Sequence, residues 1–188
     1  QENNLTETIS PAAGFRVVFS HISMVIINSL LFGVFLGLLL ITLLLGSFFR
    51  SIPFGVLSAF PNVLPIASAF GIWALYDGQV GFMVAAGMGS TLGIIVDFTV
   101  HLLSKYDLAR REMGQSPEEA VVFAFESVGF ALIVMTIVIS LGFLVLNLVN
   151  FMPLHDFARF STISFVMALI IDFLLFPNLL VKFDKRQF

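Results

Sequence analysis

Long apolar stretches alternate with short polar or charged connections along this chain. Apolar stretches that can cross the roughly 30 Å hydrocarbon layer of a membrane are expected to be helical, because lipid offers no partners to backbone polar groups. We predict five such spans, over residues 24–49, 53–76, 80–104, 118–149 and 157–182. The pattern therefore predicts an all-α polytopic membrane protein.

Local signals mark where some of these helices begin or bend. Ser116-Pro117-Glu118-Glu119 has the N-cap, early proline and later carboxylate of a capping box, so a helix should begin there. Pro61 and Pro65 should kink the second span, and Asn62 between them suggests non-helical backbone at depth. Pro177 should bend the fifth span.

The basic residues predict the orientation of the spans. One side of the membrane would carry seven of them and the other side only Arg16 and Arg159. The side rich in Lys and Arg is normally cytoplasmic, which places the C-terminus inside and the N-terminus outside. The seven residues are Arg50, Lys105, Arg110, Arg111, Lys182, Lys185 and Arg186.

This topology suggests three regions. We expect an extracytoplasmic segment over 1–23, a membrane block over 24–183 with a cytoplasmic loop at 105–117, and a cytoplasmic tail over 184–188. Residues 1–15 lack the basic start and short apolar core of a signal peptide. An external N-terminus followed by five spans is typical of the end of a larger chain, so we expect an exported domain to precede Gln1.

Composition narrows the possible functions. The chain is 59% hydrophobic and only 11% charged, with a mean hydropathy of +1.04, whereas soluble domains carry about 25% charged residues. A net charge of −3 offers no basic surface for nucleic acid. The absence of cysteine excludes Cys-ligated zinc, iron–sulfur clusters and disulfides. No HExxH or GxSxG motif occurs, so we expect neither an enzyme nor a cofactor.

The third span contains the most informative stripe of residues. Gly89, Gly93, Asp97 and His101 recur at every fourth position, which places them on one face of a helix. The small residues would let another helix approach closely, and the ionisable residues are costly in lipid and therefore suggest function. The stripe predicts a packed, partly polar seam with a pair that can exchange protons. Alternatively, Asp97 and His101 only satisfy each other, and as metal ligands they are too few for a catalytic zinc site.

Two further polar residues within the spans are candidates for the same relay. Asp172 lies near mid-membrane in the fifth span, and functional and structural roles are equally open. Thr136 in the fourth span either hydrogen-bonds to Asp97 or bonds back to its own helix. Glu126 is close enough to the start of that helix to serve only its N-terminus.

The motif from Gly93 to His101 resembles the G-x-x-x-D-D/Y-x-x-H signature of the resistance–nodulation–division (RND) superfamily, in its Patched-like and MMPL-like exporter branches. Further similar segments keep the same order and spacing over residues 14–183. They are Phe49-Arg50-Ser51, Pro61-Asn62-Val63-Leu64-Pro65, Gly129 to Thr136, Gly142 to Leu146 and Asp172 to Leu180.

The resemblance implies half of an RND-type helical bundle. Each half of these transporters has one helix, a large extracytoplasmic domain and then five helices, a block also called a sterol-sensing domain in eukaryotic relatives. The short tail here matches the second half. The implied partners are the other half and the porter domains of the same transporter or of a partner subunit, membrane lipids, protons and a hydrophobic or lipid substrate, in an assembly that is compatible with an oligomer.

The implied activity is proton-motive-force-driven export in the bacterial cytoplasmic (inner) membrane. The resemblance gives Asp97 a place in the proton relay, with His101, Asp172 and Thr136 as its candidate companions. Many relatives have a carboxylate or Tyr where this chain has Phe98, which removes one polar group from the relay. The alternative is a sterol-sensing-like lipid-binding or accessory subunit that does not transport.

Overall fold

The computed structural model describes residues 15–48, 52–76 and 78–184, and this part of the chain is helical except for short connections. Five helical segments are long and apolar enough to span a membrane, which confirms the predicted fold class. The elements are α1 Phe15–Phe48, α2 Ile52–Tyr76, α3 Phe82–Arg111, α4 Pro117–Ala124, the π-helical turn η2 Phe125–Gly129, α5 Phe130–Val145, the 3-10 turn η3 Leu146–Leu148, α6 Met152–Leu174 and α7 Phe176–Phe183.

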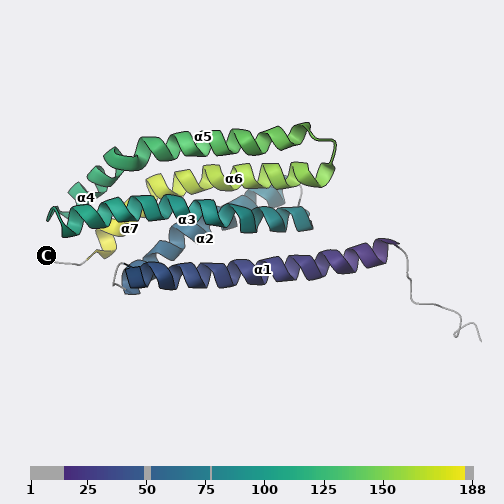
Figure 1. Cartoon of the computed structure of the whole chain (residues 1–188), viewed down its shortest axis with the longest axis horizontal. Coiled ribbons are helices and arrows are strands. Elements are labelled where there is room, and N and C mark those ends of the chain that lie inside the picture. The colour runs from purple at the N-terminus through teal and green to yellow at the C-terminus, as the bar shows by residue number, and fades with distance from the viewer. Residues whose placement is uncertain (1–14, 49–51, 77, 185–188) are drawn as a thin grey trace, which may run out of the picture.

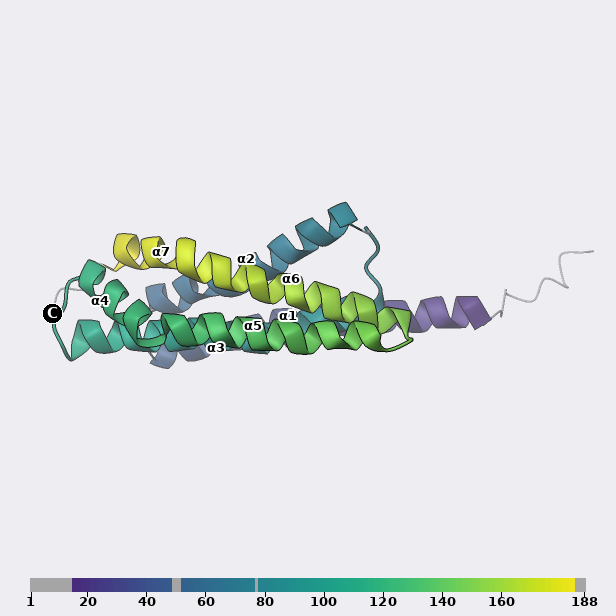
Figure 2. The same cartoon turned by 90° about the horizontal axis from the view of Figure 1, so that it is seen from above.

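The helices lie side by side along one long direction (Figure 1). α6 packs against α2, α3 and α5, while α1 packs against α2 and α3 at the edge of the block. Large side chains fill the interfaces, with Trp73, Phe98, Phe160 and Phe165 almost fully buried. Figure 2 shows α2 slanting across its neighbours, so that its last turn stands apart and Leu75 is 91% exposed. α1 and α5 turn most of their apolar side chains outward, as expected for helices that face lipid.

α1 and α2 meet through backbone rather than through side chains. A Cβ added to Gly55 would lie 2.7 Å from the Cα of Gly46 and 2.8 Å from the carbonyl oxygen of Thr42. This approach leaves no room for a side chain at Gly55. In lipid, helices gain no hydrophobic driving force from association. Small residues let the backbones approach closely, and the resulting van der Waals packing stabilises the contact.

The prediction of non-helical backbone around Asn62 is wrong, because α2 is helical through Pro61 and Pro65. Polar side chains here bond within the protein, where water is excluded. The Asn62 amide donates to the carbonyl of Ser58 at 2.6 Å, and the Thr99 hydroxyl donates to Asn62 Oδ1 at 3.1 Å. These bonds tie the proline-containing part of α2 to α3 within the buried interface.

The connection between the third and fourth spans, predicted over 105–117, is partly helical. Residues 105–111 continue α3 as helix, and an i,i+4 ion pair between Asp107 and Arg111 at 2.9 Å supports this last part. The capping box at Ser116 is confirmed, with Ser116 Oγ accepting from the Glu119 N–H and the Glu119 carboxylate accepting from the Ser116 N–H.

A buried ion pair ties the end of α3 to the end of α7. Arg110 Nε lies 2.9 Å from Asp184 Oδ2, and the Tyr106 hydroxyl donates to the same oxygen at 2.7 Å. The two charged side chains are 8% and 0% exposed. We call Tyr106, Arg110 and Asp184 the latch. The sequence pattern around Arg110 indicated only membrane topology, and this contact was not predicted.

The helix contact at Gly55 makes a prediction with a matched control in the same helix. Gly55→Ala should destabilise the protein by about 1–3 kcal/mol, because overpacking against backbone cannot be relieved by a side-chain rotation. Gly71→Ala should be neutral or stabilising by up to roughly 1 kcal/mol, because nothing lies within 4 Å of its added Cβ and alanine is the better helix former. Thermal unfolding in detergent measures both, and equal effects would contradict the close approach.

The latch makes a second stability prediction. Asp184→Ala leaves a buried guanidinium without its carboxylate and should cost about 3–5 kcal/mol. The comparison is Asp107→Ala, which removes a more exposed pair and should cost less than about 1 kcal/mol. Denaturant titration in detergent gives the two values, and a latch variant as mild as the Asp107 variant would show that the buried pair contributes little.

Candidate functional site

Asp97 and His101 form the ionisable pair that the sequence predicts. His101 Nε2 lies 3.5 Å from Asp97 Oδ1, and the side chains are 53% and 50% exposed, respectively. The residues are one turn apart on α3, so the helix itself brings them together. Their exposed position lies within a helix of membrane-spanning length and composition.

The face of α3 that carries this pair is uncovered in the described part of the chain. Ser90 and Gly93 lie on the same face and are also exposed, and nothing lies within 4 Å of a Cβ added to Gly93. Gly89, at the edge of this face, has only ordinary contact with Val34 of α1, at 3.8 Å. We call the surface of Ser90, Gly93, Asp97 and His101 the open face of α3.

The neighbours of α3 leave this open face free. α1 packs on one flank, α4 and η2 pack on another, and α2 and α6 cover the buried side. Figure 1 shows α3 between α1 and α5 in that view. The sequence predicted that another helix packs on this stripe. In the described part of the chain the stripe is present, but no helix packs over it.

Thr136 does not join the pair in this arrangement. It is buried, and its hydroxyl donates to the carbonyl of Leu132 at 2.9 Å, so the back-bonding alternative is the one that the structure has. Leu132, Thr136 and Ser140 are the buried residues of α5, which packs on α6. The structure therefore directs Thr136 to the core and Asp97 to the outside.

Asp172 is also separate from the pair. It is fully buried on α6, and neither carboxylate oxygen has a hydrogen-bond partner among the described residues. The helix breaks just beyond it at Leu175, and α7 begins with Phe176 and Pro177, which confirms the predicted bend. Of the four candidate relay residues, the structure brings together only Asp97 and His101.

Two buried hydroxyls were missed in the sequence analysis. Ser140 Oγ on α5 and Ser161 Oγ on α6 are buried without hydrogen-bond partners among the described residues. Ser140 is four residues after Thr136, so its helical spacing to that candidate could have drawn attention to it. Ser161 carries no such signal, because its burial depends on the close approach of Gly87, where an added Cβ would lie 3.2 Å from Ser161 Oγ.

An apolar groove lies beside the open face, between α1 and α3. It has a volume of about 430 Å³. Val100 and Ser104 form its α3 side and are close in sequence to the ionisable pair. Its α1 side consists of Leu44, Leu45 and Ser47.

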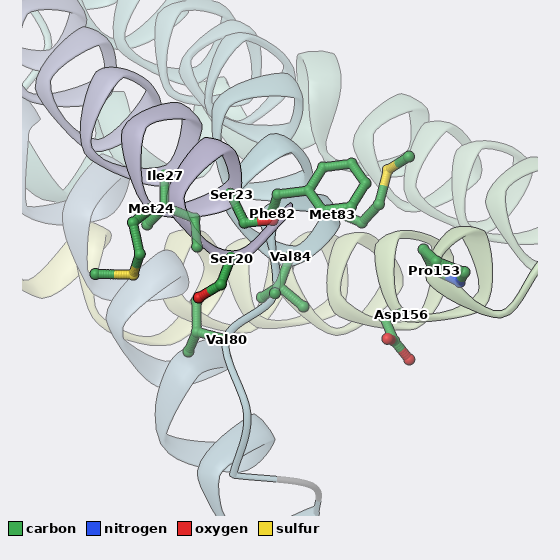
Figure 3. Close-up of a pocket in the computed structure, with 11 residues that line it drawn as sticks. Ser20, Ser23, Met24, Ile27, Val80, Phe82, Met83, Val84, Pro153 and Asp156 are labelled. Atoms are coloured by element: carbon green, nitrogen blue, oxygen red, sulfur yellow. The ribbon is translucent and has the colours of Figure 1, made fainter. Parts of the chain in front are cut away.

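A second pocket, of about 370 Å³, lies at the other end of the block (Figure 3). It is lined by α1, by the segment that leads into α3, and by the start of α6. Its polar side chains are Ser20, Ser23 and Asp156, and in Figure 3 the Asp156 carboxylate lies apart from the two serines. These groups do not converge on one point, so the pocket offers no defined chemistry.

The described ranges contain no group of three or more His, Asp or Glu side chains that could hold a metal ion. Asp97 and His101 together supply two potential ligands, fewer than the three protein ligands of a catalytic zinc site. The pair itself offers a carboxylate and an imidazole that are close enough to share a proton.

No protein-family model matches the chain. The chain is 26% identical over 151 residues to a protein of Methanocaldococcus jannaschii that bears the name "Putative membrane protein". The matched region covers 80% of this chain and 38% of that protein, so the chain spans less than half the length of its relative. This similarity and the five membrane-length helices identify the chain as a multi-pass membrane protein.

Proposed function

We propose that this chain is the membrane block of a transporter that uses the proton-motive force to export hydrophobic or amphiphilic molecules, lipids included, as the resemblance to RND transporters implies. One observation carries the proposal. The pair Asp97 and His101 is half exposed on a helix of membrane-spanning length, with no helix of the described chain packed over it.

The cost of an ionisable group in lipid restricts what can lie against this pair. An aspartate in the middle of a span costs about 2.5–3.5 kcal/mol on insertion scales, so such residues normally face protein or water rather than lipid. Gly93 and Ser90 on the same face are small enough to admit a second helix closely. We infer that the open face of α3 is covered by helices outside this chain, as expected for one half of a larger bundle.

Proton binding at the pair would change the packing of that interface. A carboxylate against another helix demands a polar partner, whereas a neutral carboxyl does not. His101 is one turn nearer the cytoplasm in the orientation proposed from the basic residues, and its ring lies beside the Asp97 carboxylate. Loading Asp97 and emptying it would therefore alternate between two packings of α3 against its partner, and an extracytoplasmic domain would respond to that change.

The location follows from the energy source. We propose the cytoplasmic membrane of a bacterium, with the N-terminal end of the chain outside and the C-terminal end in the cytoplasm. The excess of basic residues at the ends of α3 and α7 supports this orientation. The proton gradient across such a membrane would supply the driving force.

The groove between α1 and α3 favours a second candidate function. Its volume of about 430 Å³ and its mainly apolar lining suit part of an acyl chain or a ring system. A block that only bound lipid there would be a sterol-sensing-like or accessory subunit. Such a subunit would need no proton coupling, and the costly pair on the open face is the reason that we place it second.

The transport proposal predicts the effect of Asp97→Asn in the full-length protein. The neutral amide cannot carry a proton, so uptake of ethidium or an NBD-labelled phospholipid into inverted vesicles, driven by a pH gradient, should fall to the level of vesicles without the protein. Asp107→Asn, a change in an exposed ion pair at the end of the same helix, should leave uptake unchanged. Where the wild-type protein takes up ethidium or the labelled phospholipid, uptake by Asp97→Asn with the same pH dependence would refute the relay.

The covered-face proposal is tested with single cysteines, because the chain has no cysteine of its own. A spin label at Ser90→Cys should collide little with oxygen in the membrane, because protein covers it in the full-length transporter. The control is Val138→Cys on the exposed face of α5, where 61% of the residue is accessible and a lipid-like collision rate is expected. A Ser90 label as accessible as the Val138 label would mean that the open face of α3 faces lipid.

A further inference from the structure

The interior of the block contains a second carboxyl with no part in the proposed relay. Asp172 is fully buried, and both of its carboxylate oxygens lack hydrogen-bond partners among the described residues. Buried polar groups in native proteins are almost always paired, so each exception requires a specific explanation. The candidates are a neighbouring cation, a bound metal ion, or a proton.

No cation from the packed elements neutralises this carboxyl. α5 carries no titratable residue, and Asp97 and His101 on α3 belong to the open face rather than the buried one. Arg110 is already paired with Asp184. The other titratable residues of the packed elements do not bond to either Asp172 oxygen, and they are Tyr76, Lys105, Tyr106, Asp107, Arg111, Glu118, Glu119, Glu126, His155, Asp156, Arg159 and Lys182.

A bound metal ion is the weaker explanation. Hard cations need several oxygen ligands, commonly six or more for Ca²⁺ and Mg²⁺. The described residues hold no cluster of three His, Asp or Glu side chains, and the Thr136 and Ser164 hydroxyls already donate to carbonyls of their own helices. A proton requires no further ligand, and it removes the charge that the apolar interior disfavours.

Aromatic contacts give the level of Asp172 along the block relative to the buried hydroxyls of α5 and α6. The next residue, Phe173, packs its ring 4.9 Å from that of Phe125 in η2, which sets the level of Asp172 beside the π-helical turn. At the other end, Phe143 of α5 lies between Phe157 and Phe165 of α6, with ring centroids 5.5 and 5.2 Å apart.

These contacts fix the order of the polar side chains, because α5 and α6 run in opposite directions (Figure 1). Ser161 comes first, Ser140 and then Thr136 follow from α5, and Asp172 lies last, roughly 16 Å from Ser161 along α6 at about 1.5 Å per residue. Ser161 Oγ and Ser140 Oγ also lack partners. Ser161 and Asp172 are eleven residues apart, about three helical turns, so they lie on one face of α6, and Ser161 also lies beside Gly87 of α3. We call the line from Ser161 past Ser140 and Thr136 to Asp172 the α5–α6 seam.

We propose that Asp172 is a second proton-binding site, held as the neutral acid inside the block and reached along the α5–α6 seam. The hydroxyls of Ser140 and Ser161 would hydrogen-bond to water that enters the seam, as unpaired buried groups commonly do. This inference does not depend on the proposed function, because a buried neutral acid is compatible with transport at Asp97 and with its absence.

Infrared spectroscopy of the full chain in lipid vesicles tests the site. The wild-type protein at neutral pH should show the carbonyl-stretch band of a protonated carboxylic acid, and the band should shift after transfer to deuterated water. It should disappear in Asp172→Asn and remain in Asp97→Asn. A wild-type spectrum without this band at neutral pH would overturn the proposal, and this outcome requires no variant to fold.

The seam is tested by the rate of that deuterium shift. Ser140→Ala and Ser161→Ala each remove one hydroxyl and should slow the shift by roughly tenfold, the factor that one hydrogen bond is worth. Ser58→Ala is the matched control, because Ser58 is a buried serine on α2 whose hydroxyl already donates to the carbonyl of Gly55. Rates equal to the wild type in both seam variants would show that the proton reaches Asp172 by another route, and a band that survives in Asp172→Asn would refute the site itself.

Discussion

Lipid supplies no hydrogen bonds, so each polar group within the spans must find its partner in protein, in trapped water or in a proton. Most of the block follows from this constraint. The hydroxyls of Thr42, Thr136 and Thr162 donate to carbonyls of their own helices. Asn62 connects α2 to α3 through Thr99, and the charges of Arg110 and Asp184 pair in the latch. The groups that escape this rule are few, and they define both proposals.

The carboxyls of Asp97 and Asp172 are the main exceptions, and their environments are opposite. Asp97 is half exposed and has an ionisable neighbour, so its environment depends on what covers the open face of α3. Asp172 is sealed inside and has no partner among the described residues, so its environment depends only on the block itself. The first belongs to an interface, and the second belongs to a core. This distinction separates a site that a partner can control from one that the isolated block already contains.

Sequence patterns predicted the helices and their local features better than they predicted contacts between helices. Span length, the capping box at Ser116 and the break near Pro177 depend on nearby residues, and all three appear in the structure. The continuous helix through Pro61 was not predicted, because the bonds around Asn62 involve another helix. For the same reason, the burial of Ser161 depends on Gly87, which is distant in sequence. In the fourth span, the wider turn of η2 also shifts the face on which later residues such as Thr136 lie.

The latch has a mechanical consequence. Because Asp184 follows α7 and Arg110 lies near the end of α3, the third and fifth spans are clamped together where they leave the membrane. A rotation of α3 about its own axis would have to break a buried ion pair, whereas a tilt of α3 together with α6 and α7 would preserve it. In the transporter that we propose, motion at the open face would therefore pivot about the latch, with the largest displacement at the other end of the block.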